Sequence, residues 1–344
     1  IIIDKDNVIV AGHTRLKAAK KLGMKTVPCV VADDLTPEQI KAFRVADNST
    51  AQIAEWDLEL LKDELMDLDF DMSLFGLEKE IKDIERIFAP EIIEDDVPEV
   101  DEKNIITKLG DIWQLGRHRL MCGDSTDKAT VEKLMNGVKA DMVFTDPPYN
   151  IGYQGVSDKR TIQNDKMTDE DFVDFLEKAL MPCETMYVCC SWQYSHLFRQ
   201  ALENIGQKIK AMIVWDKVNP AQHLDKYFKQ HEIIWYCGAF GGEKTLRGDV
   251  WQCKRQKNTV HPTMKPLELI GMALQDQPEK KIVYDGFGGS GSTLIACEQL
   301  NRICYMMELD PKYCDVIIER FIKLTGKEVY LLKGEEKIPY STLK

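Results

Sequence analysis

The sequence lacks the features that mark membrane, disulfide-rich or zinc-binding proteins. No apolar run reaches the roughly 18 residues that a membrane-spanning helix needs, and we find no signal peptide at the start of the chain. The ten cysteines include no C-x-x-C pair, and the six histidines are scattered. We therefore expect a cytoplasmic protein with reduced, buried thiols, no disulfide framework, no metal and no membrane partner.

The excess of acidic over basic side chains lies in the first third of the chain. The 344 residues carry 45 Lys and Arg against 57 Asp and Glu, a net charge of −12. Residues 1–102 hold 12 basic and 25 acidic side chains, whereas residues 103–344 hold 33 and 32. The acidic balance therefore does not exclude a nucleic-acid partner for the second part. A length of roughly 150 residues per domain predicts two domains.

Residues 1–31 predict two paired strands, a helix and a further strand. A turn at residues 4–7 joins the first two strands as a hairpin. The helix begins near Gly12, and Gly23 is placed to end it. The last strand is expected over residues 26–31.

The run G-H-T-R-L-K-A-A-K-K-L-G followed by V-P-C-V-V resembles the ParB-like (partition-protein/sulfiredoxin-type) nuclease family. The resemblance covers about the first fifty residues and implies a partial, small α+β domain that places phosphate-containing ligands at the start of the helix. His13 stands where nucleotide-hydrolysing partition proteins have Glu, so a fold is implied more safely than an activity. His13 and Arg15 could equally serve only to cap and pair at the helix N-terminus.

The segment after this hairpin and helix predicts an extension and then a linker. Residues 36–88 are helical by pattern, and Thr36-Pro37-Glu38 is a helix-start signal. Residues 89–104 combine acidic side chains with two prolines, which is typical of an interdomain linker. We therefore expect an N-terminal domain at 1–88 and a second domain at 105–335.

A short apolar run at residues 140–144 leads directly into T-D-P-P-Y-N at residues 145–150. Two consecutive prolines cannot donate ladder hydrogen bonds, so the strand must end there. Open α/β sheets bind their ligands at the carboxyl ends of strands. Asp146 and the Pro147 carbonyl offer two acceptors and Tyr149 a flat aromatic face. This combination suits a planar heterocycle with an exocyclic amino group.

An aromatic amine is a poor nucleophile because its lone pair is delocalised into the ring. Two acceptors that bind its N–H groups would localise that pair. A base inside a duplex must first be flipped out, at a cost of roughly a few kcal/mol. Stacking on an aromatic side chain returns about 1–3 kcal/mol. The alternative is a Pro-Pro turn that begins with an Asp cap.

A second buried strand, at residues 281–284, runs into D-G-F-G-G-S-G-S-T at residues 285–293 and then a helix. Backbone N–H groups of such a loop favour a carboxylate or a phosphate. The next strand, at residues 303–307, ends in Glu308, where an acidic side chain typically binds ribose hydroxyls. A nicotinamide enzyme stays open as an alternative, although the spacing is not G-x-G-x-x-G.

The order of four motifs is similar to that of the β-group amino-DNA methyltransferases, in which the catalytic half precedes the cofactor half. The motifs are G-D-S at 123–125, D-P-P-Y at 146–149, H-P-T-M-K-P at 261–266 and the glycine loop. Over about 105–330 the resemblance implies a doubly wound, mostly parallel α/β sheet of the Rossmann-like methyltransferase type. It also implies base flipping and a place in DNA methylation or restriction–modification.

The resemblance assigns two sets of site residues. The flipped base would be held by the catalytic residues Asp146, Pro147, Pro148 and Tyr149. The cofactor implied is S-adenosyl-L-methionine, with Glu308 on its ribose, Asp124 near its adenine, and Thr263 and Lys265 approaching its carboxylate. The complete cofactor set is Asp124, Ser125, Asp146, Thr263, Lys265, Asp285, Phe287, Gly289, Ser290, Gly291, Ser292 and Glu308.

The methylated base is expected to be adenine, at N6. In the family pattern an Asp at position 146 accompanies mostly adenine and a Ser mostly cytosine, but both amines need two acceptors. Cytosine-N4 methylation therefore stays an alternative. A DNA-binding or partition-like module with a degenerate methyltransferase half is the rival from another class.

Residues 216–260 match the position at which the family reads its target sequence. The surrounding stretch 206–261 holds 10 basic and 5 acidic side chains, interleaved with aromatic residues. We expect double-stranded DNA as the partner and leave a homodimer open; a solvated charged rim is the alternative reading. The predicted phosphate contacts are Lys226, Lys229, Arg247, Lys254, Arg255 and Lys257.

Overall fold

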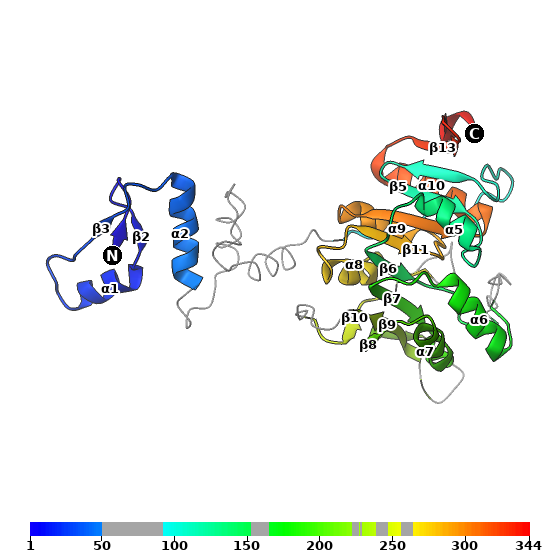
Figure 1. The fold of residues 1–344 in the computed structure, drawn as a ribbon, viewed down its shortest axis with the longest axis horizontal. Coiled ribbons are helices and arrows are strands. Elements are labelled where there is room, and N and C mark those ends of the chain that lie inside the picture. Colours follow the sequence, from blue (N-terminus) through cyan, green and yellow to red (C-terminus); the bar gives the residue numbers. More distant parts are fainter. Residues whose placement is uncertain (50–91, 153–164, 222–226, 228, 239–246, 256–263) are drawn as a thin grey trace. The chain divides into compact units, whose positions relative to one another are not determined.

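The computed structural model describes residues 1–344 apart from 50–91, 153–164, 222–226, 228, 239–246 and 256–263. The chain divides into two compact units, Ile1–Ala89 and Pro90–Lys344 (Figure 1). None of the helices in the described ranges combines the length and apolar character that a bilayer crossing requires. All ten cysteines carry free thiols.

The described part of the first unit, residues 1–49, contains a three-stranded sheet in the order β2-β1-β3 and two helices. β1 pairs antiparallel with β2 through the predicted hairpin and parallel with β3. The elements are β1 (Ile2–Ile3), β2 (Ile9–Ala11), α1 (His13–Lys21), β3 (Val30–Val31) and α2 (Pro37–Ser49).

Local chemistry explains the element ends in this unit. Thr36 Oγ1 accepts the Gln39 N–H at 3.2 Å, and Gln39 Oε1 accepts the Thr36 N–H at 2.9 Å. This reciprocal capping box starts α2. The predicted strand at 26–31 is shorter than expected, because only its last two residues pair with β1. Pro28 has no N–H to donate to a ladder.

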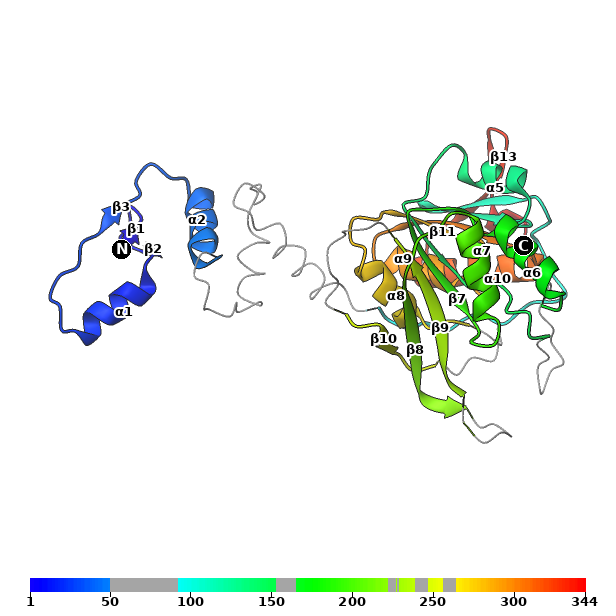
Figure 2. The same ribbon diagram turned by 60° about the horizontal axis from the view of Figure 1, so that its bottom comes forward.

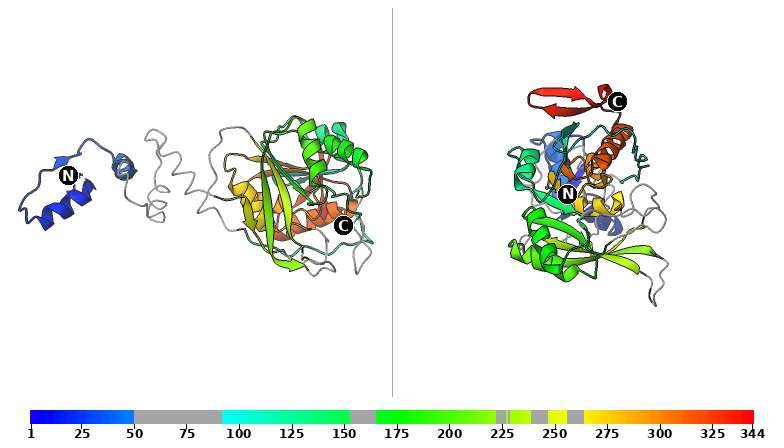
Figure 3. Two further views of the ribbon diagram at one scale, coloured as in Figure 1. Left: turned by 90° about the horizontal axis from the view of Figure 1, so that it is seen from below. Right: turned by 90° about the vertical axis from the view of Figure 1, so that its right-hand side faces the viewer.

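The second unit is built on an 11-stranded sheet in the order β10-β8-β9-β7-β6-β11-β12-β5-β4-β13-β14. β8 and β9 form a long hairpin that extends away from the helices (Figure 2). The β13–β14 hairpin forms the opposite edge, close to the C-terminus (Figure 3). The strands are β4 (Ile112–Leu115), β5 (His118–Cys122), β6 (Met142–Thr145), β7 (Thr185–Cys190), β8 (Ile209–Ala221), β9 (Lys229–Cys237), β10 (Val250–Gln252), β11 (Ile282–Asp285), β12 (Ile303–Glu308), β13 (Val329–Lys333) and β14 (Glu336–Pro339).

The prediction of a mostly parallel sheet is wrong for its flanks. The central strands β7-β6-β11-β12-β5 are parallel, whereas β9 pairs antiparallel with β7 and β8, and β4 pairs antiparallel with β5 and β13. Two-residue turns join β4 to β5 and β13 to β14, and such turns allow only antiparallel pairing. Gly116 and Gly334 supply the positive φ values, 58° and 61°.

Helices cover both faces of the central strands, as the doubly wound prediction requires (Figures 1 and 3). Alternate residues of β6 point to opposite faces: Phe144 packs in the apolar cluster with α8–α10, and Val143 in the cluster with α5–α7. The helices are α5 (Lys128–Met135), α6 (Asp169–Ala179), α7 (Ser195–Asn204), α8 (Leu267–Gln275), α9 (Ser292–Gln299) and α10 (Pro311–Thr325), with a short 3₁₀ helix η2 (Tyr340–Thr342).

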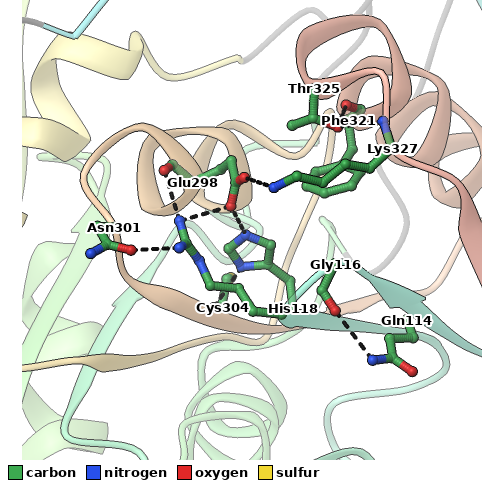
Figure 4. A network of polar contacts seen from close by, with 10 residues as sticks. Gln114, Gly116, His118, Glu298, Asn301, Cys304, Phe321, Thr325 and Lys327 are labelled. Carbon is green, nitrogen blue, oxygen red and sulfur yellow. Dashed lines mark hydrogen bonds and ion pairs between the residues drawn. The ribbon is translucent and has the colours of Figure 1, made fainter.

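A buried histidine network lies at the amino ends of β5 and β12 (Figure 4). His118 is fully buried; its Nδ1 accepts the Cys304 N–H at 2.9 Å, and its Nε2 lies 2.8 Å from Glu298 Oε2. Glu298 also pairs with Arg117 and with Lys327, each at 2.8 Å. Burial lowers the pKa of His118, so the ring is a neutral Nε2–H donor. This network ties two strands to α9.

Candidate functional site

The carboxyl ends of β6 and β11 are adjacent and directly bonded. β6 and β11 pair in parallel, and the Thr145 hydroxyl donates to Asp285 Oδ1 at 2.9 Å between two buried side chains. β6 ends at Thr145, because Pro147 cannot donate to the ladder. The Asp-Pro-Pro-Tyr motif begins at the next residue, Asp146. The Asp-Pro-Pro-Tyr motif and the glycine loop, which are 140 residues apart in the sequence, therefore meet at one edge of the sheet.

Both carboxylate oxygens of Asp146 have partners. Lys265 Nζ lies 2.6 Å from Oδ2, and the Tyr149 hydroxyl donates to Oδ1 at 2.6 Å. Burial raises the pKa of Asp146, an effect that the Lys265 ammonium opposes. Burial alone would lower the pKa of Lys265, but the carboxylates of Asp146 and Glu232 outweigh it and raise that pKa above its usual range. Lys265 is therefore a buried cation held by two acids.

Glu232 on β9 completes this cluster and was not among the predicted site residues. Its Oε2 lies 3.3 Å from Lys265 Nζ and accepts from the Tyr149 hydroxyl at 3.1 Å, while its Oε1 lies 2.6 Å from Lys217 Nζ on β8. Burial would raise the pKa of Glu232, but the two ammonium groups lower it to about 2. The only sequence signal was an acid at the start of the apolar run of β9.

The Tyr149 ring is half-buried and has neighbours on two sides. Lys265 Nζ lies 5.2 Å from its centroid, and Phe198 of α7 packs edge-on at 6.3 Å. Pro147 is buried and Pro148 is half-buried beside it. The aromatic ring is thus fixed at the strand end, with a cation on it.

The N–H groups of the glycine loop between β11 and α9 donate to the acids at the ends of β11 and β12. Glu308 Oε2 accepts the Gly289 N–H at 2.6 Å, and Asp285 Oδ1 accepts the Phe287 N–H at 3.0 Å. A side chain at Gly288 would come within 2.8 Å of Met306, and Gly291 has φ of 85°, so both positions require glycine.

The two carboxyl groups that accept these N–H groups, Asp285 at the end of β11 and Glu308 at the end of β12, have raised pKa values. Burial raises the pKa of Asp285 to about 7, against hydrogen bonds from Thr293, the Phe287 N–H and Thr145. Burial likewise raises the pKa of Glu308 to about 7, against the N–H groups of Asp310 and Gly289. Both groups can therefore donate or accept hydrogen bonds near neutral pH.

The G-D-S motif lies at the same edge. β5 is parallel to β12, and the Gly123 N–H donates to the Glu308 carbonyl at 2.9 Å. Asp124 is exposed at this end, while Ser125 is buried and its Cβ would lie 3.4 Å from a Cβ built on Gly286. Ser290 and Ser292 are buried in the glycine loop. Of the predicted cofactor residues, only Thr263 lies outside the described part of the chain.

The predicted DNA contacts fall into three groups. Lys229 on β9 is exposed, as are Lys254 and Arg255 after β10. Arg247 is half-buried, and its Nε lies 3.4 Å from Asp276, whose side chain is 2% exposed. Lys226 and Lys257 lie outside the described residues.

In the described ranges, no group of three or more His, Cys, Asp and Glu residues is arranged to hold a metal ion.

Comparison with known proteins gives matches over this second unit. A family model described as DNA methylase matches residues 140–239 and 241–319. The Type II methyltransferase M2.LlaDCHI of Lactococcus lactis subsp. cremoris is 27% identical over 233 residues, covering 56% of this chain and 86% of the relative. Type II methyltransferase M2.DpnII of Streptococcus pneumoniae is 26% identical over 218 residues, covering 52% and 81%. The crystal structure of the M1.HpyAVI–SAM complex aligns with a TM-score of 0.45 at 22% identity, covering 58% of this chain and 98% of that one.

Proposed function

The chain belongs to the DNA methylase family, and we propose that it transfers a methyl group from S-adenosyl-L-methionine to the exocyclic amino group of a flipped DNA base, adenine N6. The observation that carries this proposal is the Thr145–Asp285 hydrogen bond of 2.9 Å. It joins the strand end that bears Asp146 to the strand end that bears the glycine loop. A base held at the first would be next to a cofactor held at the second.

The residues of this edge fit S-adenosyl-L-methionine by their chemistry. Gly288 and Gly291 let the loop pack closely on β12 and α10, because a side chain at either position would meet Met306 or Ile317. Glu308 offers an acceptor for ribose hydroxyls, and Lys265 is a cation for a carboxylate. We propose that the cofactor is held by Asp124, Ser125, Thr263, Lys265, Asp285, Phe287, Gly289, Ser290, Gly291, Ser292 and Glu308, with Asp146 at its methyl end. When bound, it supplies an electrophilic methyl group on a sulfonium sulfur that takes up the electron pair of the broken C–S bond.

The proposed catalytic work of this chain is to orient and deprotonate the amine. Asp146 and the Pro147 carbonyl accept its two N–H groups, Tyr149 stacks on the base, and Pro148 keeps the corner rigid. The amino nitrogen forms the new bond to carbon, and its surplus proton leaves to Asp146 or to water. The raised pKa of Asp146 favours that transfer.

Substrate binding requires an exchange of partners at Asp146. Both of its oxygens are taken, by Lys265 and by Tyr149. Glu232 can hold the Lys265 ammonium or the Tyr149 hydroxyl when Asp146 releases it, because Glu232 already lies 3.3 Å from the first and 3.1 Å from the second. We therefore propose that Glu232 receives the partners that Asp146 releases when a base enters.

Adenine is proposed from the family pattern that pairs an Asp at this position with adenine. Cytosine N4 is the second candidate, because the N6 amine of adenine and the N4 amine of cytosine both need two acceptors. Incubating the full chain with methyl-labelled S-adenosyl-L-methionine and mixed-sequence duplex DNA, then digesting the DNA to nucleosides, tests both points. We expect label in N6-methyladenine. Label in N4-methylcytosine would show that the methylated base is cytosine and not adenine. Unlabelled DNA would overturn the proposed function and favour a DNA-binding module with a degenerate methyltransferase half.

We propose residues 216–260 as the region that contacts duplex DNA, with Lys229, Lys254 and Arg255 as exposed phosphate ligands. Lys226 and Lys257 stay predictions from sequence. Arg247 would first have to leave Asp276. We further propose a cytoplasmic enzyme of DNA methylation or restriction–modification, and a homodimer stays a prediction.

For the first unit we propose a partial ParB-like domain over residues 1–88. Its support is the β1–β2 hairpin followed directly by α1, with Gly12 at φ of 96° at the start of the helix. Binding of the isolated phosphate ion or a nucleotide near His13 and Arg15 is the property to measure.

A further inference from the structure

The acidic stretch at residues 89–104, which the sequence analysis interprets as a linker, packs against the rest of the second unit. We call residues 92–96 the acidic strap. The side-chain amide of Gln299 on α9 brackets Ile93, donating to its carbonyl at 2.8 Å and accepting its N–H at 2.9 Å. Ile92 packs so closely against Gly271 of α8 that any side chain at that glycine would overlap it. The acidic strap therefore packs on α8 and α9, two helices on the same face of the sheet.

A buried arginine joins the strap to the glycine loop. Asp95 accepts from Arg320 of α10 through both oxygens, at 2.8 Å from Nε and 2.6 Å from Nη2. The Arg320 side chain is 0% exposed. Its remaining nitrogen, Nη1, donates to the Ser290 carbonyl at 2.9 Å and lies 3.3 Å from Ser292 Oγ. One guanidinium thus holds the strap on one side and the loop on the other.

The geometry makes the two halves of this contact interdependent. A guanidinium is planar, so a bidentate carboxylate fixes the plane in which its third nitrogen can donate. The Ser290 carbonyl belongs to the turn closed by the Gly291 N–H donating to the Gly288 carbonyl at 2.8 Å. Without Asp95, the buried charge of Arg320 would have no carboxylate partner and would turn toward solvent or toward another acceptor.

A second strap residue contacts the other side of the site. Glu94 Oε1 accepts the Glu268 N–H at 3.1 Å in the first turn of α8, which begins two residues after Lys265. Lys265 in turn contacts Asp146 at 2.6 Å. The acidic strap therefore contacts α10, whose Arg320 binds the glycine loop, and α8, which follows the segment that carries Lys265.

We propose that Asp95 is a positioning residue for cofactor binding: through Arg320 it fixes the loop 288–292 in the conformation that receives S-adenosyl-L-methionine. This inference rests on the proposed function. A purely structural staple is the competing explanation, and it predicts a loss of stability without a specific change in cofactor affinity.

The test compares full-length Asp95→Asn with Asp96→Asn. Asp96 is the neighbouring acid, 98% exposed and 3.9 Å from Lys323, so it is a matched control for charge. We expect the KM for S-adenosyl-L-methionine to rise about tenfold in Asp95→Asn with kcat and the KM for DNA nearly unchanged. The control should change by less than about twofold. Calorimetric titration with S-adenosyl-L-homocysteine should give the same ratio.

Arg320→Lys distinguishes a role of Asp95 in positioning the loop from a purely structural role. Lysine keeps a positive charge beside Asp95 but lacks the planar fork through which Arg320 binds Asp95 with two nitrogens and the Ser290 carbonyl with the third, so the same rise in cofactor KM is expected. If Asp95→Asn does not fold, this variant decides the question alone. A cofactor KM equal to wild type in the folded variants overturns the proposal, even where the melting temperature falls. Wild-type protein that neither binds the cofactor nor labels DNA would instead refute the proposed function.

Discussion

Two charged networks lie at opposite edges of the parallel part of the sheet, one at the amino ends of β5 and β12 and one at the carboxyl end of β6, and they differ in how their partners are distributed. At the amino end, His118 has one donor and one acceptor, and Glu298 collects three cationic or N–H partners. At the carboxyl end, the Lys265 ammonium and the Tyr149 hydroxyl each lie between two acids. The first network has one arrangement, whereas the second can exchange partners without leaving a buried charge alone. Buried ionic groups of the same kinds thus serve stability in one place and are suited to chemistry in the other.

The pKa values follow the same division. The hydrogen bond from His118, with help from Lys327 and Arg117, lowers the pKa of Glu298 to about 2, so it stays ionised. Burial raises the pKa of Asp285 and Glu308 to about 7. Asp285 and Glu308, at the carboxyl end of the sheet, can therefore change their protonation near neutral pH.

The largest expected effect is at Asp146. Asp146→Ala removes the acceptor for the amine, and methyl transfer to DNA should fall by about 10³-fold. Lys265 keeps Glu232 as a partner, so cofactor affinity should stay within about threefold of wild type. Asp146→Asn is the matched variant for side-chain volume; it keeps an acceptor oxygen but cannot take up the proton, so it should lose activity by a smaller factor. Initial rates with labelled cofactor and calorimetric binding measure both quantities; full activity in Asp146→Ala would remove Asp146 from the mechanism.

Glu298→Ala tests the opposite end. It leaves His118, Arg117 and Lys327 without their common acid, and we expect the free energy of unfolding to fall by about 2–4 kcal/mol. The Arg117 and Lys327 side chains are 34% and 56% exposed, so water replaces part of what is lost. Urea unfolding measures the change. The cofactor KM of the folded variant should match wild type, and a specific loss of methyl transfer would erase the distinction between the two networks.

Glu232→Gln should have an intermediate effect. The amide keeps an acceptor for Tyr149 but loses the charge that can receive Lys265, so the ammonium stays on Asp146 and competes with the base. We expect kcat to fall about tenfold, with the cofactor KM within about twofold of wild type. Steady-state kinetics with cofactor and DNA varied separately check this. An unchanged kcat would show that partner exchange does not limit the reaction.

The smallest expected effect is a pH dependence of stability. Folding raises the pKa of Glu308 from an ordinary 4.5 to about 7, so the protonated form is favoured in the folded state. The stabilisation is complete below the unfolded pKa of about 4.5 and is lost as the pH rises through about 7. Urea midpoints at pH 5 and pH 8 should therefore fall less in Glu308→Gln than in wild type. Equal changes in the two proteins would contradict a raised pKa at Glu308.

The sequence was sufficient for the parts of the site that are local in the chain. The strand end at Asp146 follows from two prolines, and the glycine loop follows from positions where a side chain would clash or φ is positive. Glu232 and Lys217 could not be predicted, because the antiparallel pairing of β8 and β9 brings them to the site.

The acidic segment shows a second reason why sequence falls short. Composition at residues 89–104 is that of a linker, and nothing local indicates packing. Asp95 is held by Arg320, which lies 225 residues further along the chain. The prediction for the edge of the sheet failed for a similar reason, since β13 joins the sheet by pairing with β4, and β14 by pairing with β13.

A crystal structure of the full chain with S-adenosyl-L-homocysteine would examine the shared edge of β6 and β11 most directly. We predict the ribose against Glu308 and the sulfur facing Asp146, with Lys265 moved toward Glu232 or toward the ligand's carboxylate. A ligand bound away from the glycine loop, or one whose sulfur is walled off from Asp146, would contradict the proposed methyl transfer.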